Sequence, residues 1–124
     1  MKNNEFFKAI REQLNGMTCD EIENFWMERG RSAAFSAWRK GNKQNLDFPF
    51  LTYPLYEDEF SEFLETLEEA GFKKFGFTTL GRGIVQNIIG FLKAGWKLTG
   101  VSKFDAGMDD DPFAVDGLIF EKRD

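Results

Sequence analysis

A short pattern that occurs twice in the second half of the chain limits its fold more than any other feature. When "LEEAGFKKFGF" (67–77) is aligned with "FLKAGWKLTGV" (91–101), four residue types coincide at a constant offset of 24 residues: Ala70/Ala94, Gly71/Gly95, Lys73/Lys97 and Gly76/Gly100. Each copy reads as a helix end, a glycine stop, an aromatic residue and a strand. An internal duplication gives this pattern, and so does helix-ending chemistry acquired twice. Under either interpretation the sequence predicts the order helix, strand, helix, strand.

Apolar spacing locates these elements along the chain. Helices are predicted over 57–70 and 83–94, because apolar residues recur there at intervals of three and four. Strands are predicted over 72–79, 96–104 and 118–122, where aromatic and aliphatic residues lie between glycine or aspartate turns. The second half therefore reads as αβαββ.

The strand, helix and strand at 72–104 form a βαβ unit, so we expect the strands 72–79 and 96–104 to run parallel and to pair directly. The strand at 118–122 is expected to return antiparallel to its predecessor. The predicted fold class is α+β: a small mixed sheet containing one parallel βαβ unit and an antiparallel C-terminal strand, covered by the helices 57–70 and 83–94, with N-terminal helices.

The N-terminal part is predicted to be helical. Thr18 and Glu21 have the spacing of a capping box, which starts a helix that runs toward Trp38 and ends near Gly41. A shorter helix precedes it, because apolar residues recur at helical spacing at Phe6, Phe7, Ile10 and Leu14.

The length and composition fit a single globular domain over 1–124, with a helical N-terminal part at 1–45 and an αβαββ part at 57–124. The segment between them, 46–56, is apolar but contains two prolines. Because proline cannot donate to a sheet ladder, we expect an extended connector there and not a central strand.

The composition excludes several chemistries. Histidine is absent and Cys19 is the single cysteine, which excludes histidine bases, His-paired nucleophiles, an intrachain disulfide and structural zinc sites. The net charge of −5 disfavours attraction to nucleic acid or to an anionic membrane. Neither a signal peptide nor a membrane-spanning run is recognisable. We therefore expect a soluble cytoplasmic protein without cofactor, metal site or catalytic residues, and the sequence favours a non-enzymatic role.

The segment "FTTLGRGIVQNIIG" (77–90) raises the alternative of a phosphate-binding loop. Thr79, Gly81, Arg82 and Gly83 lie between a predicted strand and a predicted helix, where free amides attract anions. The dinucleotide fingerprint is broken, because Gln86 occupies the place of its third glycine. The competing interpretation is a plain turn in which Gly81 or Gly83 adopts a positive φ.

Aspartates are expected beside this loop and argue against phosphate binding. The carboxyl ends of parallel strands lie at one edge, so Asp105, Asp109–Asp111 and Asp116 are predicted to emerge there and to repel a phosphate. Asp109–Asp111 lack the spacing of a calcium loop and read as a solvated hairpin loop.

The aromatic content suggests a surface for another protein. The chain has 15 Phe, 3 Trp and 2 Tyr, more than one small core is expected to need. We predict a non-enzymatic interaction protein, whose partner is another protein or a second copy of the chain. The predicted contact residues are Trp38, Phe48, Phe50, Tyr53 and Tyr56.

Charge is distributed unevenly along the chain. The segment 29–43 is basic and the segment 57–69 is acidic. The two segments are expected to meet either within one chain or between two chains in a salt-sensitive dimer. Binding of nucleic acid by the basic segment is not expected. Its cations are Arg29, Arg31, Arg39, Lys40 and Lys43.

Two stretches, "GRSAAFSAWRKG" (30–41) and "FTTLGRGIVQNIIGFLKAGWKLTGV" (77–101), carry a family resemblance. Through them the chain resembles a family of short uncharacterised proteins of Gram-positive gut bacteria, often encoded near conjugative elements. The resemblance covers the second helix and the βαβ part. The family has no assigned activity, so the resemblance implies an accessory protein of a mobile element and assigns no site residue.

Overall fold

The computed structural model describes residues 32–70, 72–107 and 113–122. The predicted helix at 6–14, the capping box at Thr18 and the cations Arg29 and Arg31 lie outside these residues, as do Asp109–Asp111. The described helices are α3 (Ser32–Lys43), α4 (Glu57–Ala70) and α5 (Ile84–Lys93). The described strands are β1 (Phe50–Leu51), β2 (Lys74–Thr78), β3 (Lys97–Asp105) and β4 (Ala114–Glu121). In this part of the chain no helix has the length and apolar content needed to cross a bilayer.

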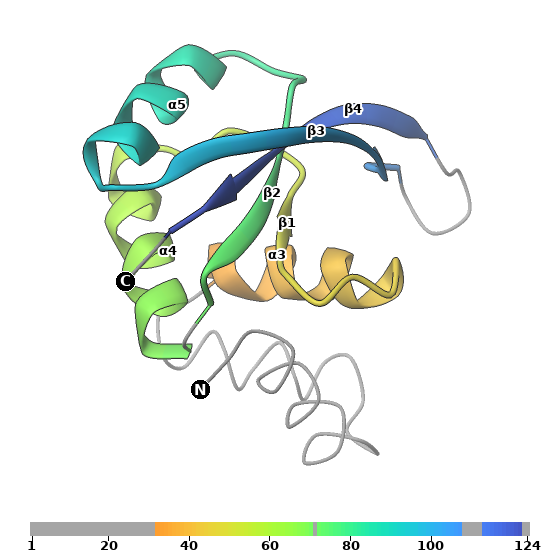
Figure 1. The fold of residues 1–124 in the computed structure, drawn as a ribbon, viewed down its shortest axis with the longest axis horizontal. Helices are drawn as coiled ribbons and strands as arrows, with labels where there is room; N and C mark the ends of the chain where they lie inside the picture. The colour runs from red at the N-terminus through yellow and green to blue at the C-terminus, as the bar shows by residue number, and fades with distance from the viewer. Residues whose placement is uncertain (1–31, 71, 108–112, 123–124) are drawn as a thin grey trace.

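The described strands form one mixed sheet in the order β1-β2-β4-β3 (Figure 1). β1 is parallel to β2, whereas β4 is antiparallel to both β2 and β3. The α+β class and the antiparallel C-terminal strand are therefore confirmed. The connector 46–56 contributes only the two residues of β1, at the edge of the sheet. Its prolines lie outside this short strand, so their missing N–H groups interrupt no strand pairing.

The expected direct pairing of 72–79 with 96–104 is wrong, because β4 lies between β2 and β3. The two outer strands keep a common direction, so β2, α5 and β3 form a split βαβ unit. The insertion gives β4 two antiparallel ladders, which are slightly more stable per residue than parallel ones. It also stacks Phe120 of β4 on Phe75 of β2, with ring centroids 5.3 Å apart.

One face of the sheet is covered by α4 and α5, as the sequence predicts. Phe63 of α4 meets Phe75 edge-on, with ring centroids 5.4 Å apart, and Phe91 of α5 packs on Phe120 at 5.3 Å. Phe60 joins the two helices by stacking on Phe91. α4 thus lies over β2, and α5 lies over β4 toward β3.

The opposite face holds a second group of rings. Phe50 and Phe104 stack at 4.5 Å, and Phe48 meets Phe104 edge-on. The rings lie over Gly76 of β2 and Gly117 of β4, where a Cβ atom would come within 2.7 Å and 2.4 Å of ring atoms. Glycine is required at both positions because the aromatic rings occupy the space of a side chain.

α3 ends two residues later than predicted. Gly41 lies inside the helix, with its Cα against the backbone of Phe48. The left-handed residue is Asn45, at φ 58°, and the N–H of Leu46 donates to the carbonyl of Gly41. These are the features of a Schellman motif, with asparagine where glycine is most common.

The same hydrogen bond explains the repeated pattern of the second half. At the end of α4 the N–H of Phe72 donates to the carbonyl of Leu67, and at the end of α5 the N–H of Trp96 donates to the carbonyl of Phe91. Gly95 supplies the positive φ of 98° for the second cap. The repeat therefore corresponds to two helix ends of the same chemistry, each followed by a strand of the same direction.

A buried asparagine fixes the connector to α5. The side-chain amide of Asn87 accepts a hydrogen bond from the N–H of Leu55 at 2.6 Å and donates to its carbonyl at 3.1 Å. Both residues are buried. Asn87 thus provides hydrogen-bond partners for the buried N–H and C=O groups of Leu55, which lies outside the sheet.

Asp105 organises the turn between β3 and β4. Its carboxylate accepts hydrogen bonds from the N–H groups of Gly107 (2.9 Å) and Phe113 (3.1 Å), and Lys40 of α3 lies 3.8 Å away. These hydrogen bonds, that of Gly107 foremost, and then the Lys40 charge hold the pKa of Asp105 below its ordinary value of 3.8. Lys40 also donates to the carbonyl of Gly107.

Replacing Gly117 by alanine tests the aromatic packing over the sheet. We expect Gly117→Ala to lower the free energy of unfolding by about 1–3 kcal/mol, because the new Cβ would overlap the buried Phe104 ring. The matched control is Gly100→Ala on β3, whose Cβ would meet Ile119 at an ordinary 3.8 Å and should change stability by less than about 0.5 kcal/mol. Equal losses in urea unfolding would contradict the packing described.

Asp105→Asn isolates the charge at the turn, because asparagine keeps an oxygen acceptor. A carboxyl whose folded pKa is lowered stabilises the fold above its unfolded pKa and loses that contribution as the pH falls through its folded value. We therefore expect the variant to have a lower urea midpoint than the wild type at neutral pH, with the difference shrinking as the pH falls below the ordinary carboxyl pKa of 3.8. A difference that does not change with pH would show that the Asp105 charge has no role.

Candidate functional site

The glycine loop is a tight turn with both glycines in the left-handed region. Gly81 has φ 115° and Gly83 has φ 84°, which confirms the expectation of a positive φ. A Cβ on Gly81 would lie 2.9 Å from Pro54 of the connector. Backbone conformation and this close contact account for both glycines without a ligand.

The other predicted residues of this loop are exposed, and one is already engaged. The Thr79 hydroxyl donates to the carbonyl of Asp116 at 2.7 Å, whereas Arg82 extends into solvent. Asp116 therefore lies beside the loop, as predicted, with its carboxylate 2.7 Å from Lys103. Thr79, Gly81, Arg82 and Gly83 share one loop, and phosphate binding there stays a prediction.

The predicted contact aromatics do not form one surface. Trp38, Phe48 and Phe50 are buried in the core, so assigning them to an exposed surface is wrong. Tyr53 is half-buried, and burial raises the pKa of its hydroxyl. Tyr56 is 77% exposed, and its N–H donates a hydrogen bond to the Glu59 carboxylate at the start of α4.

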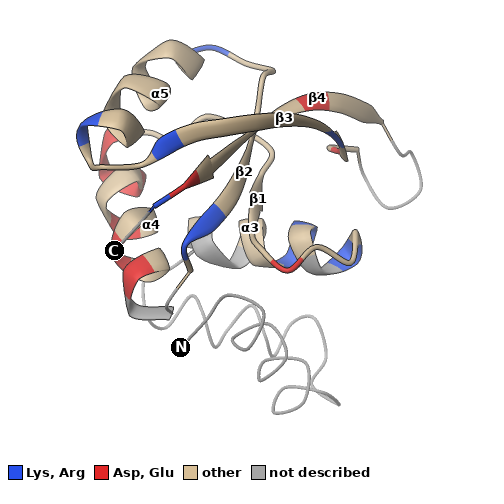
Figure 2. Ribbon diagram, in the orientation of Figure 1, with Lys and Arg blue, Asp and Glu red and all other residues tan. Residues whose placement is uncertain are grey.

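α3 and α4, which carry the described parts of the basic and acidic segments, contact each other within the chain. Figure 2 shows the described cations of α3 toward the end of that helix away from α4. Lys40 pairs with Asp105 of β3 and not with α4. Arg29 and Arg31 lie outside the described residues, so a salt-sensitive dimer stays a prediction.

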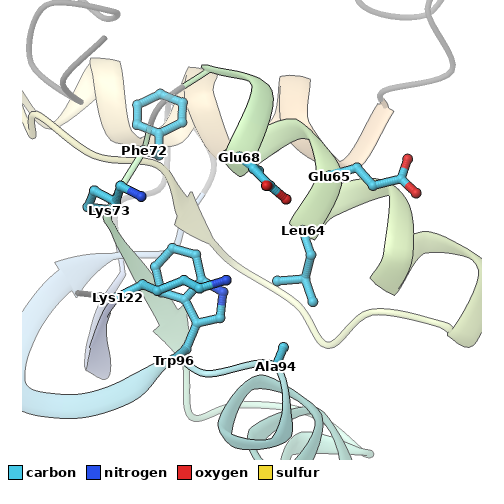
Figure 3. Close-up of a pocket in the computed structure, with 8 residues that line it drawn as sticks. All are labelled: Leu64, Glu65, Glu68, Phe72, Lys73, Ala94, Trp96 and Lys122. Atoms are coloured by element: carbon cyan, nitrogen blue, oxygen red, sulfur yellow. The ribbon is translucent and has the colours of Figure 1, made fainter. Parts of the chain in front are cut away.

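A hollow of about 380 Å³ lies between α4 and the junction of α5 with β3 (Figure 3). Its floor is the buried Trp96, with the Lys122 ammonium 5.8 Å from the ring centroid. Glu68 reaches toward this space, whereas the Glu65 carboxylate points away from it. Lys73 completes a lining of two acids and two lysines.

This lining gives the hollow no assembled catalytic group. The described residues around it carry neither a hydroxyl, a thiol nor an imidazole. Its charges balance, so it selects neither anions nor cations. We therefore do not assign it as the functional site.

A larger anomaly is the apolar surface that α5 and β3 leave uncovered. Five aliphatic side chains are between 40% and 65% exposed. They are Val85, Ile89 and Leu92 of α5 and Leu98 and Val101 of β3. We call these five residues the α5–β3 surface. Single exposed aliphatic residues are ordinary, but a group of five on adjacent elements indicates an interaction site.

The two rows of this surface border each other. A Cβ on Gly90 would touch the Phe60 ring, so that flank of α5 faces α4. Val85, Ile89 and Leu92 recur at intervals of four and three and lie on the flank turned away from α4, toward β3.

The β3 side chains point toward the same space. Leu98 is opposite Phe120, which contacts α5, and Val101 is opposite Leu118, two residues earlier on the same strand. Opposed residues of an antiparallel pair project from the same face. Leu98 and Val101 therefore lie on the α5 side of the sheet.

The border of the α5–β3 surface is basic. From Thr79 to Phe104 the chain carries four cations and no acid, in a protein of net charge −5. Figure 2 shows them at the ends of α5 and β3. They are Arg82, Lys93, Lys97 and Lys103. Of these, Lys103 pairs with Asp116, while Lys93 forms no ion pair with any described residue. Lys97 is opposite Glu121 of β4 and so projects from the face of the sheet away from α5.

β3 also presents an outer edge to solvent. The N–H of Asp105 donates to Gln44 of α3, so that end of the edge is bound. Because main-chain groups alternate in an antiparallel ladder, those of Lys103 and Val101 point to the same outer edge. No strand among the described residues pairs with them.

The sequence does contain a signal for this surface, which is the width of the apolar arc on α5. The apolar residues of α5 span more of the helix circumference than contact with one sheet covers. They are Ile84, Val85, Ile88, Ile89 and Leu92. The structure buries Phe91 fully and Ile84 and Ile88 in part, and it leaves the adjoining row exposed.

Comparison with known proteins does not extend this description. No protein-family model, no curated protein and no solved structure matches the chain. The candidate site therefore rests on the exposed apolar group of α5 and β3 and on its basic border.

Proposed function

We propose that this chain is a non-enzymatic protein-interaction module that binds its partner through the α5–β3 surface. The observation that carries the proposal is the exposure of five aliphatic side chains on two adjacent elements. The buried core already contains the rings of both sheet faces, so these five residues are not required to complete it.

The magnitude of burial supports a binding role. Covering a largely exposed aliphatic side chain contributes about 1 kcal/mol or more at 25 cal/mol per Å². A partner that covers all five side chains therefore gains several kcal/mol of binding free energy, from which the cost of association is subtracted. Interface centres are commonly apolar with a charged border, as this surface is.

We further propose that the module acts in the cytoplasm as an accessory protein of a mobile element. This part of the proposal is supported by the resemblance of residues 30–41 and 77–101 to a family often encoded near conjugative elements. The partner is then another protein of that element or of its host.

The double variant Val85→Ser/Ile89→Ser tests the binding surface. Both side chains are solvent-exposed, so we expect stability to change by less than about 1 kcal/mol. In a quantitative pull-down from a lysate of the source organism, the variant should recover at least one specific partner at about a tenth of the wild-type yield or less, the equivalent of 1.4 kcal/mol.

The control for this experiment is Tyr56→Ser, which removes a large exposed side chain from the start of α4. It should leave the recovery of that partner unchanged. Loss of the partner from the Tyr56 variant alone would move the binding site to the connector. Equal recovery by all three proteins would contradict an interaction role for the α5–β3 surface.

The second candidate function is binding of a phosphate-containing ligand or nucleotide at the Gly81–Gly83 loop. Its support is the exposed Arg82 beside the start of α5. The N–H of Asn87 makes the first hydrogen bond of this helix, to the Gly83 carbonyl, so the N–H groups before Asn87 have no partner within the helix. The adjacent Asp116 opposes an anion, so we expect no binding.

A thermal-shift panel of nucleotides and phosphorylated metabolites, with and without magnesium, measures this directly. A ligand at a hundredfold excess over its Kd adds about 2.7 kcal/mol of stability. We expect a flat panel. A shift that Arg82→Ala abolishes would establish the loop as a ligand site instead.

A further inference from the structure

Resting on the proposed function, we propose that the partner presents an acidic amphipathic α-helix, which lies along α5 and covers Leu98 and Val101 of β3. Three observations support an occupant of this kind: the spacing of the exposed row on α5, the interrupted edge of β3, and the cations Arg82 and Lys93 at the two ends of α5. Docking of an amphipathic helix through its apolar face is an established mode of recognition.

The exposed row of α5 has the spacing by which one helix packs against another. Val85, Ile89 and Leu92 recur at intervals of four and three residues, which keeps them on one line along the helix. Paired helices meet through apolar rows with these intervals, and each side chain of one row enters a space between side chains of the other. Gln86 and Lys93 come next around the helix and are exposed, so the row has a polar border.

The sheet supplies the second side of the binding surface. α4 lies over β2 and α5 lies over β4 toward β3, whereas α3, the remaining described helix, contacts β1 at the opposite edge of the sheet. Packed helix axes are about 8–10 Å apart, which is about two strand spacings. A helix at that distance from α5 lies over the outer side of β3. There it covers Leu98 and Val101, which are 49% and 65% exposed.

The edge of β3 does not suit an added strand. Its outward main-chain groups form a regular row only at Val101 and Lys103, because the ladder with β4 is irregular just before Gly100. The next outward N–H, that of Asp105, already donates to Gln44. A row of two residues is shorter than the usual strand of about five or six, so an extended peptide finds little main-chain recognition here.

The charge of the partner follows from the two ends of α5. Arg82 lies just before the helix and Lys93 is its last residue, and neither forms an ion pair with a described residue. At 1.5 Å per residue the ten residues of α5 span about 15 Å. Acidic residues about three turns apart on the partner helix complement both cations, whereas a basic helix is repelled. Lys103 contributes less, because Asp116 pairs with it.

A second copy of this chain fits the charge pattern less well than an acidic helix. Its α5 offers the same apolar row but brings a second Arg82 and a second Lys93. Antiparallel contact of two α5 helices places Arg82 of one copy near Lys93 of the other, and parallel contact places identical cations together. From Thr79 to Phe104 the chain contains no acid to compensate. An acidic helix turns this repulsion into attraction.

An anionic membrane also fits less well. The protein has a net charge of −5, so an extended negative surface repels the molecule as a whole. A helix meets only the α5–β3 surface and its border, where the charge is positive.

A display library of random peptides of about fifteen residues tests the proposal without knowledge of the natural partner. It is selected on the immobilised full chain and counter-selected on the Val85→Ser/Ile89→Ser variant. We expect enriched sequences in which apolar residues recur at intervals of three and four with Asp or Glu between them. Basic sequences, sequences with strictly alternating apolar residues, or no enrichment would each overturn the proposal.

An enriched peptide then shows whether it binds as a helix. Two analogues carry one proline each, at the first residue or in the middle. Proline is tolerated in the first turn of a helix and breaks its interior, so we expect only the central proline to weaken binding, by at least about tenfold. Mixing the parent peptide with the protein should also increase the helical circular dichroism beyond the sum of the two. Weakening by both prolines or by neither, or no gain of helical signal, contradicts a bound helix.

Two lysines that lie four residues apart in the sequence give a matched test of the border. Lys93 is on α5, whereas Lys97 projects from the face of the sheet away from α5. We expect Lys93→Glu to weaken binding of the acidic peptide by at least about fivefold, and Lys97→Glu, which changes the net charge equally, by less than about twofold. Equal effects of the two variants would overturn the assignment of Lys93.

Two further measurements separate the alternatives and the underlying function. Sedimentation with phosphatidylserine vesicles, or a dimer in solution, that the Val85→Ser/Ile89→Ser variant abolishes would overturn the acidic helix as occupant. If the pull-down depends on the α5–β3 surface but the library yields no acidic helix, the interaction role stands and this inference fails. If both fail, the proposed function fails as well.

Discussion

The ring of Phe75 joins more elements than any other contact described in this fold. It meets Phe63 of α4, Phe91 of α5, Trp96 before β3 and Phe120 of β4, with ring centroids between 4.8 and 5.4 Å apart. Each of these elements reaches the sheet through a bulky side chain, so their positions are mutually dependent. The height of α5 above the sheet, and hence the exposure of its outer flank, follows from this cluster.

Local sequence patterns predicted the elements of the second half well. The helices over 57–70 and 83–94 and the strands that follow them agree with the structure, because each is defined by the spacing of its own residues and by its capping chemistry. The order of the strands was not predictable in this way. Pairing of β4 with β2 joins Phe120 to Phe75, and no local signal distinguishes that arrangement from direct pairing of β2 with β3.

In the candidate site, too, local features were predictable from the sequence and features that depend on distant residues were not. The sequence identified the glycine turn and its positive φ angles, which depend on a few adjacent residues. It assigned Phe48 and Phe50 to the surface because their burial depends on Gly76 and Gly117, two distant glycines that leave room for the rings. The exposed row of α5 was missed for a related reason, since a helix with apolar residues on a broad arc does not reveal how much of that arc the sheet covers.

The central position of β4 has a consequence for synthesis of the protein. β4 follows β3 in the chain but lies between β3 and β2, so the sheet cannot close while β4 is still inside the ribosome. Until that moment the inner edges of β2 and β3 have no partner, and the rings of Phe75 and Phe91 lack their contacts with Phe120. Pairing of β2 and β3 into one sheet therefore waits for β4, and the nascent chain leaves these strand edges unpaired during the interval in which chaperones act.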